Sequence, residues 1–207
     1  AAGHDNKIVK YEIAQNKMVK KSEIILGAVW PNRIAPAGLT FDTKRQKLYV
    51  VTRDNRALYV IDAKTEKIEK QFGLDGEAYM SVMSTDAKEL YISCWGCDQV
   101  LVFDLEKQVW KSSIKVGDNP NELLLSPNGQ QLYVCNSNDN TVSVIHVKTK
   151  KVIETLDVAL YPNSPSGSTT NGLALDPIKK TLYIANADNN CLAVFDVATP
   201  GKSASKG

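Results

Sequence analysis

The sequence predicts an all-β protein made of repeated four-stranded antiparallel units, and three observations support this prediction. A strand of the form Leu-Tyr-Val or Leu-Tyr-Ile recurs four times, with 42, 42 and 50 residues between successive tyrosines: Tyr49, Tyr91, Tyr133 and Tyr183. Thirteen residues after each tyrosine a second apolar strand ends on a polar side chain: Asp62, Asp104, His146 and Asp196. No stretch shows the 3.6-residue spacing of a long amphipathic helix.

Each repeat contains four short strands, as the unit from 37 to 74 illustrates. Its first strand is 38–41, its second 47–52, its third 58–63 and its fourth 67–72, with turns rich in Asp, Asn and Arg between them. Four strands in every 40–45 residues are typical of a β-propeller blade. We therefore predict a part-blade at 1–27, blades at 37–74, 79–116 and 121–158, a part-blade at 171–198, and a flexible tail or linker at 199–207.

The phase of the repeat indicates an incomplete propeller. The first unit begins at the position that corresponds to the end of a blade's second strand, and the last unit ends after a third strand. The count is therefore seventeen strands, or about four to five blades. A closed ring of four blades needs sixteen, so we expect this chain to be part of a larger ring. Open blade edges leave backbone groups unpaired, which predicts a tendency to self-association.

Composition excludes some classes of function. The 207 residues carry 25 basic and 23 acidic side chains, a net charge of +2, which is too balanced for a nucleic-acid partner. No apolar run approaches the roughly 20 residues of a membrane-spanning helix. The N-terminal residues 1–6 lack the charge and the apolar run of a signal peptide.

The repeats resemble the YVTN-type β-propeller family, whose units combine a Leu-Tyr-Val strand, an Asn- and Asp-rich turn and a Val-Ile-Asp strand. Segments 1–6, 30–33, 161–163 and 185–190 are similar to the N-terminal propeller of bacterial envelope proteins that also carry a phosphoesterase domain. This resemblance implies a seven-bladed ring and a periplasmic or extracellular location. The phosphoesterase domain would lie outside this chain, and none of its motifs can be placed here.

The predicted ligand-binding surface lies where the turns between the second and third strands (the b–c turns) and the connections between blades emerge together. Two connections are long, and both begin with an aromatic residue, Pro and Asn. Loops on a rigid scaffold often carry binding residues. The predicted ligand-binding residues are His4, Trp30, Asn32, Arg33, Trp95, Asn121, Tyr161 and Asn163. The alternative is that these residues only shape turns and cap blades.

We predict no catalytic residues, no metal site and no cofactor. The motif Cys94-Trp95-Gly96-Cys97 has the spacing of redox and metal sites, but it lies at the end of a strand and not at a helix N-terminus. No second pair of this kind completes a zinc site. We expect all four cysteines to be free thiols, with a link between Cys94 and Cys97 as the alternative. His146 replaces the aspartate of the other blades and is expected to make the same hydrogen bond within its blade.

The sequence thus favours a non-catalytic binding scaffold whose partner is a protein, a glycan or a small ligand. The alternative is an enzyme, hydrolytic or redox, with its site on the propeller face. No nucleophile elbow, zinc-protease motif or phosphate-binding loop supports the enzyme. Nucleic-acid binding, a third hypothesis, conflicts with the near-neutral charge.

Overall fold

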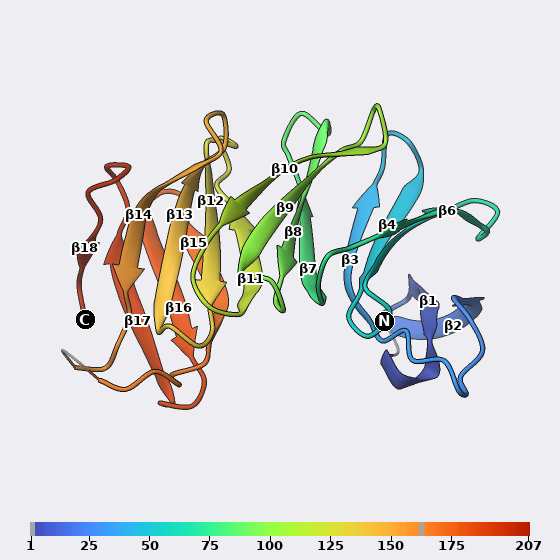
Figure 1. Cartoon of the computed structure of the whole chain (residues 1–207), viewed down its shortest axis with the longest axis horizontal. Coiled ribbons are helices and arrows are strands. Elements are labelled where there is room, and N and C mark those ends of the chain that lie inside the picture. The colour runs from blue at the N-terminus through green and yellow to red at the C-terminus, as the bar shows by residue number, and fades with distance from the viewer. Residues whose placement is uncertain (1–2, 162–163) are drawn as a thin grey trace. The chain divides into compact units, whose positions relative to one another are not determined.

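The computed structural model describes residues 3–161 and 164–207, and these residues form strands and turns with one short 3-10 helix, η1 (Gly3–Asp5) (Figure 1). The chain divides into two compact units, residues 1–81 and residues 82–207. The strands of the first unit are β1 (Lys7–Ala14), β2 (Lys17–Ile25), β3 (Pro36–Asp42), β4 (Lys47–Thr52), β5 (Ala57–Asp62) and β6 (Ile68–Gly73), and β7 (Ala78–Met83) crosses the boundary. The second unit continues with β8 (Glu89–Cys94), β9 (Gln99–Asp104), β10 (Val109–Lys115), β11 (Pro120–Leu125), β12 (Gln131–Asn136), β13 (Thr141–His146), β14 (Lys151–Asp157), β15 (Thr170–Asp176), β16 (Thr181–Asn186), β17 (Cys191–Asp196) and β18 (Ala204–Ser205).

The strands form four-stranded antiparallel sheets in chain order. Their orders are β3-β4-β5-β6, β10-β9-β8-β7, β11-β12-β13-β14 and β15-β16-β17-β18, and β1 and β2 form a two-stranded sheet. These sheets confirm the predicted fold class, an incomplete β-propeller of four-stranded antiparallel blades. Within the described residues, none of the helical structure is long and apolar enough to cross a membrane.

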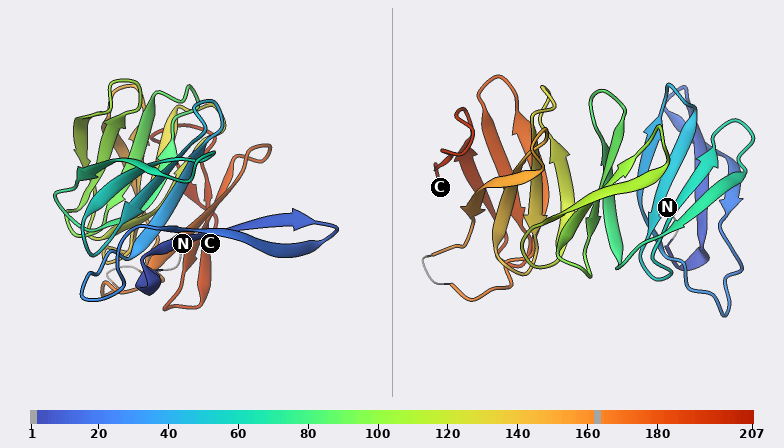
Figure 2. Two further views of the ribbon diagram at one scale, coloured as in Figure 1. Left: turned by 90° about the vertical axis from the view of Figure 1, so that its right-hand side faces the viewer. Right: turned by 45° about the horizontal axis from the view of Figure 1, so that its top comes forward.

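In the first unit, the two-stranded sheet packs against the next blade. Ile8 of β1 and Ile24 of β2 share an apolar cluster with Val50, Tyr59 and Ile61 of the blade β3–β6. Figure 2 shows β1 and β2 as a long two-stranded ribbon. The apolar side chains near the tip of this ribbon stay exposed, among them Ile13 and Met18.

In the second unit, the repeated tyrosine explains how one blade packs on the next. Tyr133 and Cys135 of β12 point to one side of their blade and pack with Leu182 and Ile184 of β16 in the following blade. Because successive side chains of a strand point to opposite faces, one strand can serve two neighbouring blades. Tyr91 and Tyr133 are each no more than 2% exposed.

The polar residue that ends each third strand closes the turn that follows it. One carboxylate oxygen of Asp62 accepts hydrogen bonds from the backbone N–H groups of Lys64 and Thr65, at 3.0 and 2.8 Å. In the same place, His146 Nδ1 accepts from the N–H of Thr149 at 3.2 Å. The structural role predicted for His146 is therefore confirmed.

The segment 199–207 differs from the expected flexible tail. It contributes β18, which pairs with β17 and supplies the fourth strand of the last sheet. Backbone bonds join Lys206 to Val194 at 2.7 Å, and Lys206 Nζ lies 3.0 Å from the carboxylate of Asp196. Backbone pairing orders this segment although its composition is that of a linker.

Candidate functional site

The b–c turns share a backbone geometry that determines where the blade connections can attach. The last residue of each turn has a positive φ of 49–54°, a conformation that Asn and Asp tolerate better than most residues. These five residues are Asn6, Arg56, Asp98, Asn140 and Asn190. The side chains of Asn6, Asp98 and Asn140 bond to the connection that leads into the next blade.

Asn6 fixes the first long connection. Its side chain is buried, and its amide nitrogen donates to the carbonyls of Ala28 and Asn32 at 2.9 and 2.8 Å. Its amide oxygen accepts from the N–H groups of Ile34 and Ala35 at 3.0 and 3.4 Å. One side chain thus ties both ends of the loop that carries Trp30, Asn32 and Arg33.

Asn140 holds the far end of the second long connection. Its amide nitrogen donates to the carbonyl of Pro165 at 2.8 Å, and its amide oxygen accepts from the N–H groups of Gly167 and Ser168 at 3.0 and 2.7 Å. Sequence reasoning missed both asparagines. The available signal was an asparagine at the last turn position ahead of each long connection.

The first unit holds four of the predicted ligand-binding residues on adjoining loops. His4 lies in η1 and is exposed, and Trp30, Asn32 and Arg33 are exposed on the connection that Asn6 holds. The side chain of Trp30 is 80% exposed, which is unusual for so large an apolar group. The peptide bond between Trp30 and Pro31 is cis.

His4 also lines a shallow pocket of about 180 Å³ within the first unit. Arg53 of a b–c turn and Tyr79 of β7 contribute side chains to it, and Arg53 pairs with Asp54 at 2.9 Å. Gly3, Ala35, Pro36 and Ala37 complete the lining. An imidazole, a guanidinium and a phenol around one hollow provide hydrogen-bond donors for a polar or anionic ligand group.

In the second unit the predicted residues separate into exposed and buried ones. Trp95 is 36% exposed and Tyr161 is 56% exposed. Asn121 is buried, 5% exposed, and its carbonyl accepts a hydrogen bond from Ser93 at 2.6 Å, so its side chain is not an open contact surface. Asn163 lies outside the described residues.

The cysteines correct one expectation. Cys94 and Cys97 form a disulfide, whereas Cys135 and Cys191 are free, as predicted. The disulfide spans the same two turn positions as Thr52 and Asn55, whose side chains meet at 2.5 Å in the preceding blade. The covalent link therefore closes a b–c turn that another blade closes with a hydrogen bond, which explains why a cysteine pair fits there without a helix.

Glu122 is a further residue that sequence reasoning missed. It is partly buried on β11, and burial raises the pKa of its carboxyl group. Burial, and then the nearby charge of Glu122, also raise the pKa of the Cys135 thiol. Among the residues that the structure describes, no three His, Cys, Asp or Glu side chains gather into a metal-binding group.

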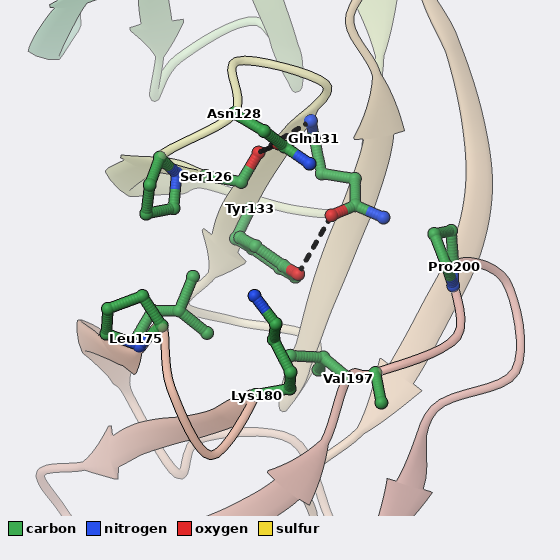
Figure 3. A pocket seen from close by; sticks show the side chains of 11 residues that line it. Ser126, Asn128, Gln131, Tyr133, Leu175, Lys180, Val197 and Pro200 are labelled. Carbon is green, nitrogen blue, oxygen red and sulfur yellow. Dashed lines mark hydrogen bonds between the residues drawn. The ribbon is translucent and has the colours of Figure 1, made fainter.

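A second pocket, which we call the Tyr133 pocket, lies on the turns at the opposite ends of the strands (Figure 3). Its volume is about 200 Å³, and it lies between the blades β11–β14 and β15–β18. Its lining consists of Ser126, Pro127, Asn128, Gln131, Tyr133, Leu175, Pro177, Lys180, Val197, Ala198 and Pro200.

The sheets and their turns define a β-propeller protein, and comparisons with known proteins identify its family. A family model described as "Lactonase, 7-bladed beta-propeller" matches residues 75–205, more than half of the chain. The chain therefore belongs to this family of seven-bladed β-propellers.

Curated relatives are similar over part of the chain. "Uncharacterized protein YncE" of Salmonella typhimurium is 31% identical over 138 residues, which cover 61% of this chain and 37% of the relative. "Antigen Lp49" of Leptospira interrogans is 30% identical over 108 residues, which cover 48% of this chain and 23% of the relative. The matches thus span less than two fifths of the length of these relatives.

Solved structures share the fold. A protein from Lactobacillus plantarum superposes with a TM-score of 0.79 at 18% identity, over 98% of this chain and 64% of that chain. Hydrazine synthase of Kuenenia stuttgartiensis matches with a TM-score of 0.68 at 21% identity, over 82% of this chain and 49% of that chain. At these identities the likeness concerns the fold alone.

Proposed function

We propose that this chain is a binding module whose ligand-binding residues lie on the b–c turns and the long blade connections within each unit. The observation that carries the proposal is that exposed aromatic side chains lie on connections whose backbone is held by a buried asparagine. Trp30 lies on a connection fixed by Asn6, and Tyr161 begins the connection that Asn140 fixes. Such preorganised aromatic residues lower the entropic cost of binding.

The chemistry of these loops, taken in each unit by itself, suits a protein, a glycan or a small polar ligand. Trp30 and Tyr161 offer stacking area, and His4, Arg33 and Arg53 offer hydrogen-bond donors. Balanced charge disfavours nucleic acid. We also propose that the whole protein lies in the bacterial envelope, binds a ligand there, and carries a phosphoesterase domain outside this chain.

An extracytoplasmic location, periplasmic or extracellular, is supported by the disulfide between Cys94 and Cys97. Disulfides persist in oxidising compartments and are rare in the cytosol.

Tryptophan fluorescence provides a direct test. Of the three tryptophans, Trp30 lies on a long connection of the first unit, Trp95 lies in a b–c turn of the second unit, and Trp110 lies on β10, so a Trp110→Phe protein reports from these loops alone. We expect a panel of defined oligosaccharides and short peptides to contain ligands that change this fluorescence. Trp30→Ala and Arg33→Ala should weaken binding about tenfold or more, as interface anchors do.

Tyr11→Ala serves as the control for this test, because Tyr11 is 48% exposed on β1, outside the b–c turns and connections. A ligand whose affinity falls equally in Tyr11→Ala and in Trp30→Ala would contradict the assignment to this surface.

Hydrolysis of a lactone is a second candidate, favoured by the description of the family and by Glu122. Burial raises the pKa of this carboxyl group, which makes it a stronger base than an exposed carboxylate. Turnover of simple lactones that disappears in Glu122→Gln, with unchanged folding, would establish it. Absence of turnover in the native chain would remove this candidate.

A further inference from the structure

In two pairs of neighbouring blades, the turn between the third and fourth strands reaches back and contacts the preceding blade through a charged side chain. Glu66 accepts hydrogen bonds from Lys10 at 2.9 Å and from Ser22 at 2.8 Å in the first unit. In the second unit, Lys150 donates to the carboxylate of Glu89 and lies 2.6 Å from the hydroxyl of Tyr91. A charged group therefore fills the gap between the blades at these places.

The Glu89 site shows what this position can hold. The carboxylate of Glu89 receives hydrogen bonds from the Tyr91 hydroxyl and from Lys111 Nζ, each at 2.6 Å, and from Lys150. A phenol and two ammonium groups thus bind one carboxylate at the edge of a gap between two blades. The arrangement is a charge-assisted network, the stronger class of hydrogen bond.

The Tyr133 pocket is the same position one blade further along the chain. Gln131 and Tyr133 replace Glu89 and Tyr91, each 42 residues later, and the turn that carries Lys150 has its counterpart in the turn with Pro200. Proline has no charged group to reach back. The tyrosine hydroxyl is retained, but the residues that line this gap include no carboxylate and no lysine in the position of Lys150. The carboxylate of Glu154, outside the lining, raises the pKa of Tyr133 in addition to burial and accepts hydrogen bonds from Ser203.

Figure 3 shows how the remaining polar groups lie around the pocket. The hydroxyl of Tyr133 points toward the amide of Gln131 across a long contact of 3.5 Å, and the side chain of Lys180 extends toward the tyrosine. Tyr133 and Gln131 are 2% and 7% exposed, so these polar groups lie in a largely dry wall. Lys180 is the one charged residue among those that line the pocket.

We propose that the Tyr133 pocket binds the carboxylate of a small aliphatic acid. Lys180, the Tyr133 hydroxyl and the Gln131 amide provide donors of the kind that hold the Glu89 carboxylate in the neighbouring gap. Leu175, Val197 and Pro200 provide the apolar wall for a short hydrocarbon chain. The volume of about 200 Å³ is below the roughly 300–1,000 Å³ of sites for larger molecules, so the ligand is small.

This site is independent of the proposed binding surface. It is formed by turns at the other ends of the strands and shares no residue with that surface. Loss of ligand binding at Trp30 would leave the carboxylate site untouched, and the two proposals can therefore fail separately.

Calorimetric or NMR titration of the whole chain with butyrate and with its neutral analogue butyramide tests the proposal. We expect butyrate to bind with a millimolar dissociation constant, to shift signals of residues 126–133 and 175–200, and to bind about tenfold more tightly than butyramide. Equal binding of the two compounds, no binding of butyrate, or binding of phosphate in preference to butyrate would overturn it.

Two variants with a matched control locate the site. Lys180→Gln should weaken butyrate binding about tenfold, and Tyr133→Phe should weaken it several-fold while keeping the buried ring. Lys179→Gln is the control, because Lys179 lies in the same turn but not in the pocket. An unchanged affinity in Lys180→Gln, or an equal loss in Lys179→Gln, would show that the pocket does not bind the carboxylate.

Discussion

Asn6 and Asn140 occupy equivalent turn positions in two blades, and each adopts a positive φ while its amide side chain holds a long connection. The same position in another blade is Arg56, which precedes a shorter connection. At the scale of single residues, the two long connections thus follow turns that end in asparagine, whereas a shorter connection follows arginine.

Replacement of Asn140 by Ala should therefore lower the free energy of unfolding by about 2–4 kcal/mol, because buried backbone N–H groups lose their acceptor and alanine tolerates the positive φ poorly. Urea unfolding measures this difference. Asn138→Ala is the control, since Asn138 is an exposed residue of the same turn, and it should change stability by less than about 0.5 kcal/mol. Equal losses in the two variants would contradict the clamp.

Glu89 predicts a pH dependence. Burial raises the pKa of its carboxyl group, but hydrogen bonds from Lys111, Lys150 and Tyr91 outweigh burial and lower this pKa from 4.5 to about 2. A lowered pKa in the folded state stabilises the fold above pH 4.5, and this contribution disappears as the pH falls toward 2.

At neutral pH, Glu89→Gln should accordingly destabilise the chain by about 1–2 kcal/mol, a value reduced for partial solvent screening. Thermal unfolding of both proteins between neutral pH and pH 2 measures the difference. It should shrink below pH 4.5 and vanish near pH 2. A difference that stays constant with pH would mean that the carboxylate charge does not stabilise the fold.

The residue-level predictions from sequence succeeded where a side chain serves its own turn and failed where it serves a distant segment. His146 bonds to Thr149, three residues away, and its role followed from the repeat. The burial of Asn121 and the clamp by Asn6 depend on contacts with segments far along the chain, which one sequence does not reveal.

At the scale of the turn, the disulfide is the clearest difference between the blades. Cys94 and Cys97 join the ends of a turn that the preceding blade closes with the polar side chains of Thr52 and Asn55. We expected free thiols because this pair lacks the helix of redox motifs. The two ends of a turn nevertheless lie close enough for a disulfide bond.

Labelling of thiols checks the state of all four cysteines. In the folded, unreduced protein, we expect iodoacetamide to modify Cys191 alone, because Cys135 is fully buried and burial raises the pKa of its thiol. Peptide mass spectrometry distinguishes the four sites. Modification of Cys94 or Cys97 without a reductant would show that the link is absent.

The last strand shows the limit of strand propensity. β18 contains only Ala204 and Ser205, and neither residue favours strands, so the sequence predicted a tail. The free edge of β17 supplies the backbone partners that hold it, and Glu154 adds hydrogen bonds to Ser203 at 2.7 and 2.8 Å. This strand forms because a neighbouring strand edge is available, and the local sequence of residues 199–207 does not reveal that edge.

At the scale of the whole chain, the repeat spacing of 42, 42 and 50 residues predicted the all-β blades, because the stacking of sheets requires the same buried positions in every unit. The family match to a seven-bladed propeller agrees with this conclusion. The identity of the ligand does not follow from the spacing, since the stacking constrains buried strands and leaves the outer loops free to vary.

The two-stranded sheet β1–β2 predicts self-association of this chain. Among the residues that the structure describes, no further strand pairs with its edges, and Ile13 and Met18 are 77% and 67% exposed. We expect sedimentation velocity to show oligomers that grow with concentration and become monomeric in the double variant Ile13→Lys and Met18→Lys. Ile178→Lys is the control, because Ile178 is 89% exposed but lies in a turn. An equal loss of oligomers in this variant would indicate nonspecific hydrophobic association.

The amide clamps have a practical consequence for engineering. Because Asn140 secures Pro165, Gly167 and Ser168, this end of the loop is held to its blade by hydrogen bonds to three residues. Foreign recognition peptides grafted directly ahead of Pro165 should therefore leave the blades intact, so the chain offers an insertion point for building new affinity reagents.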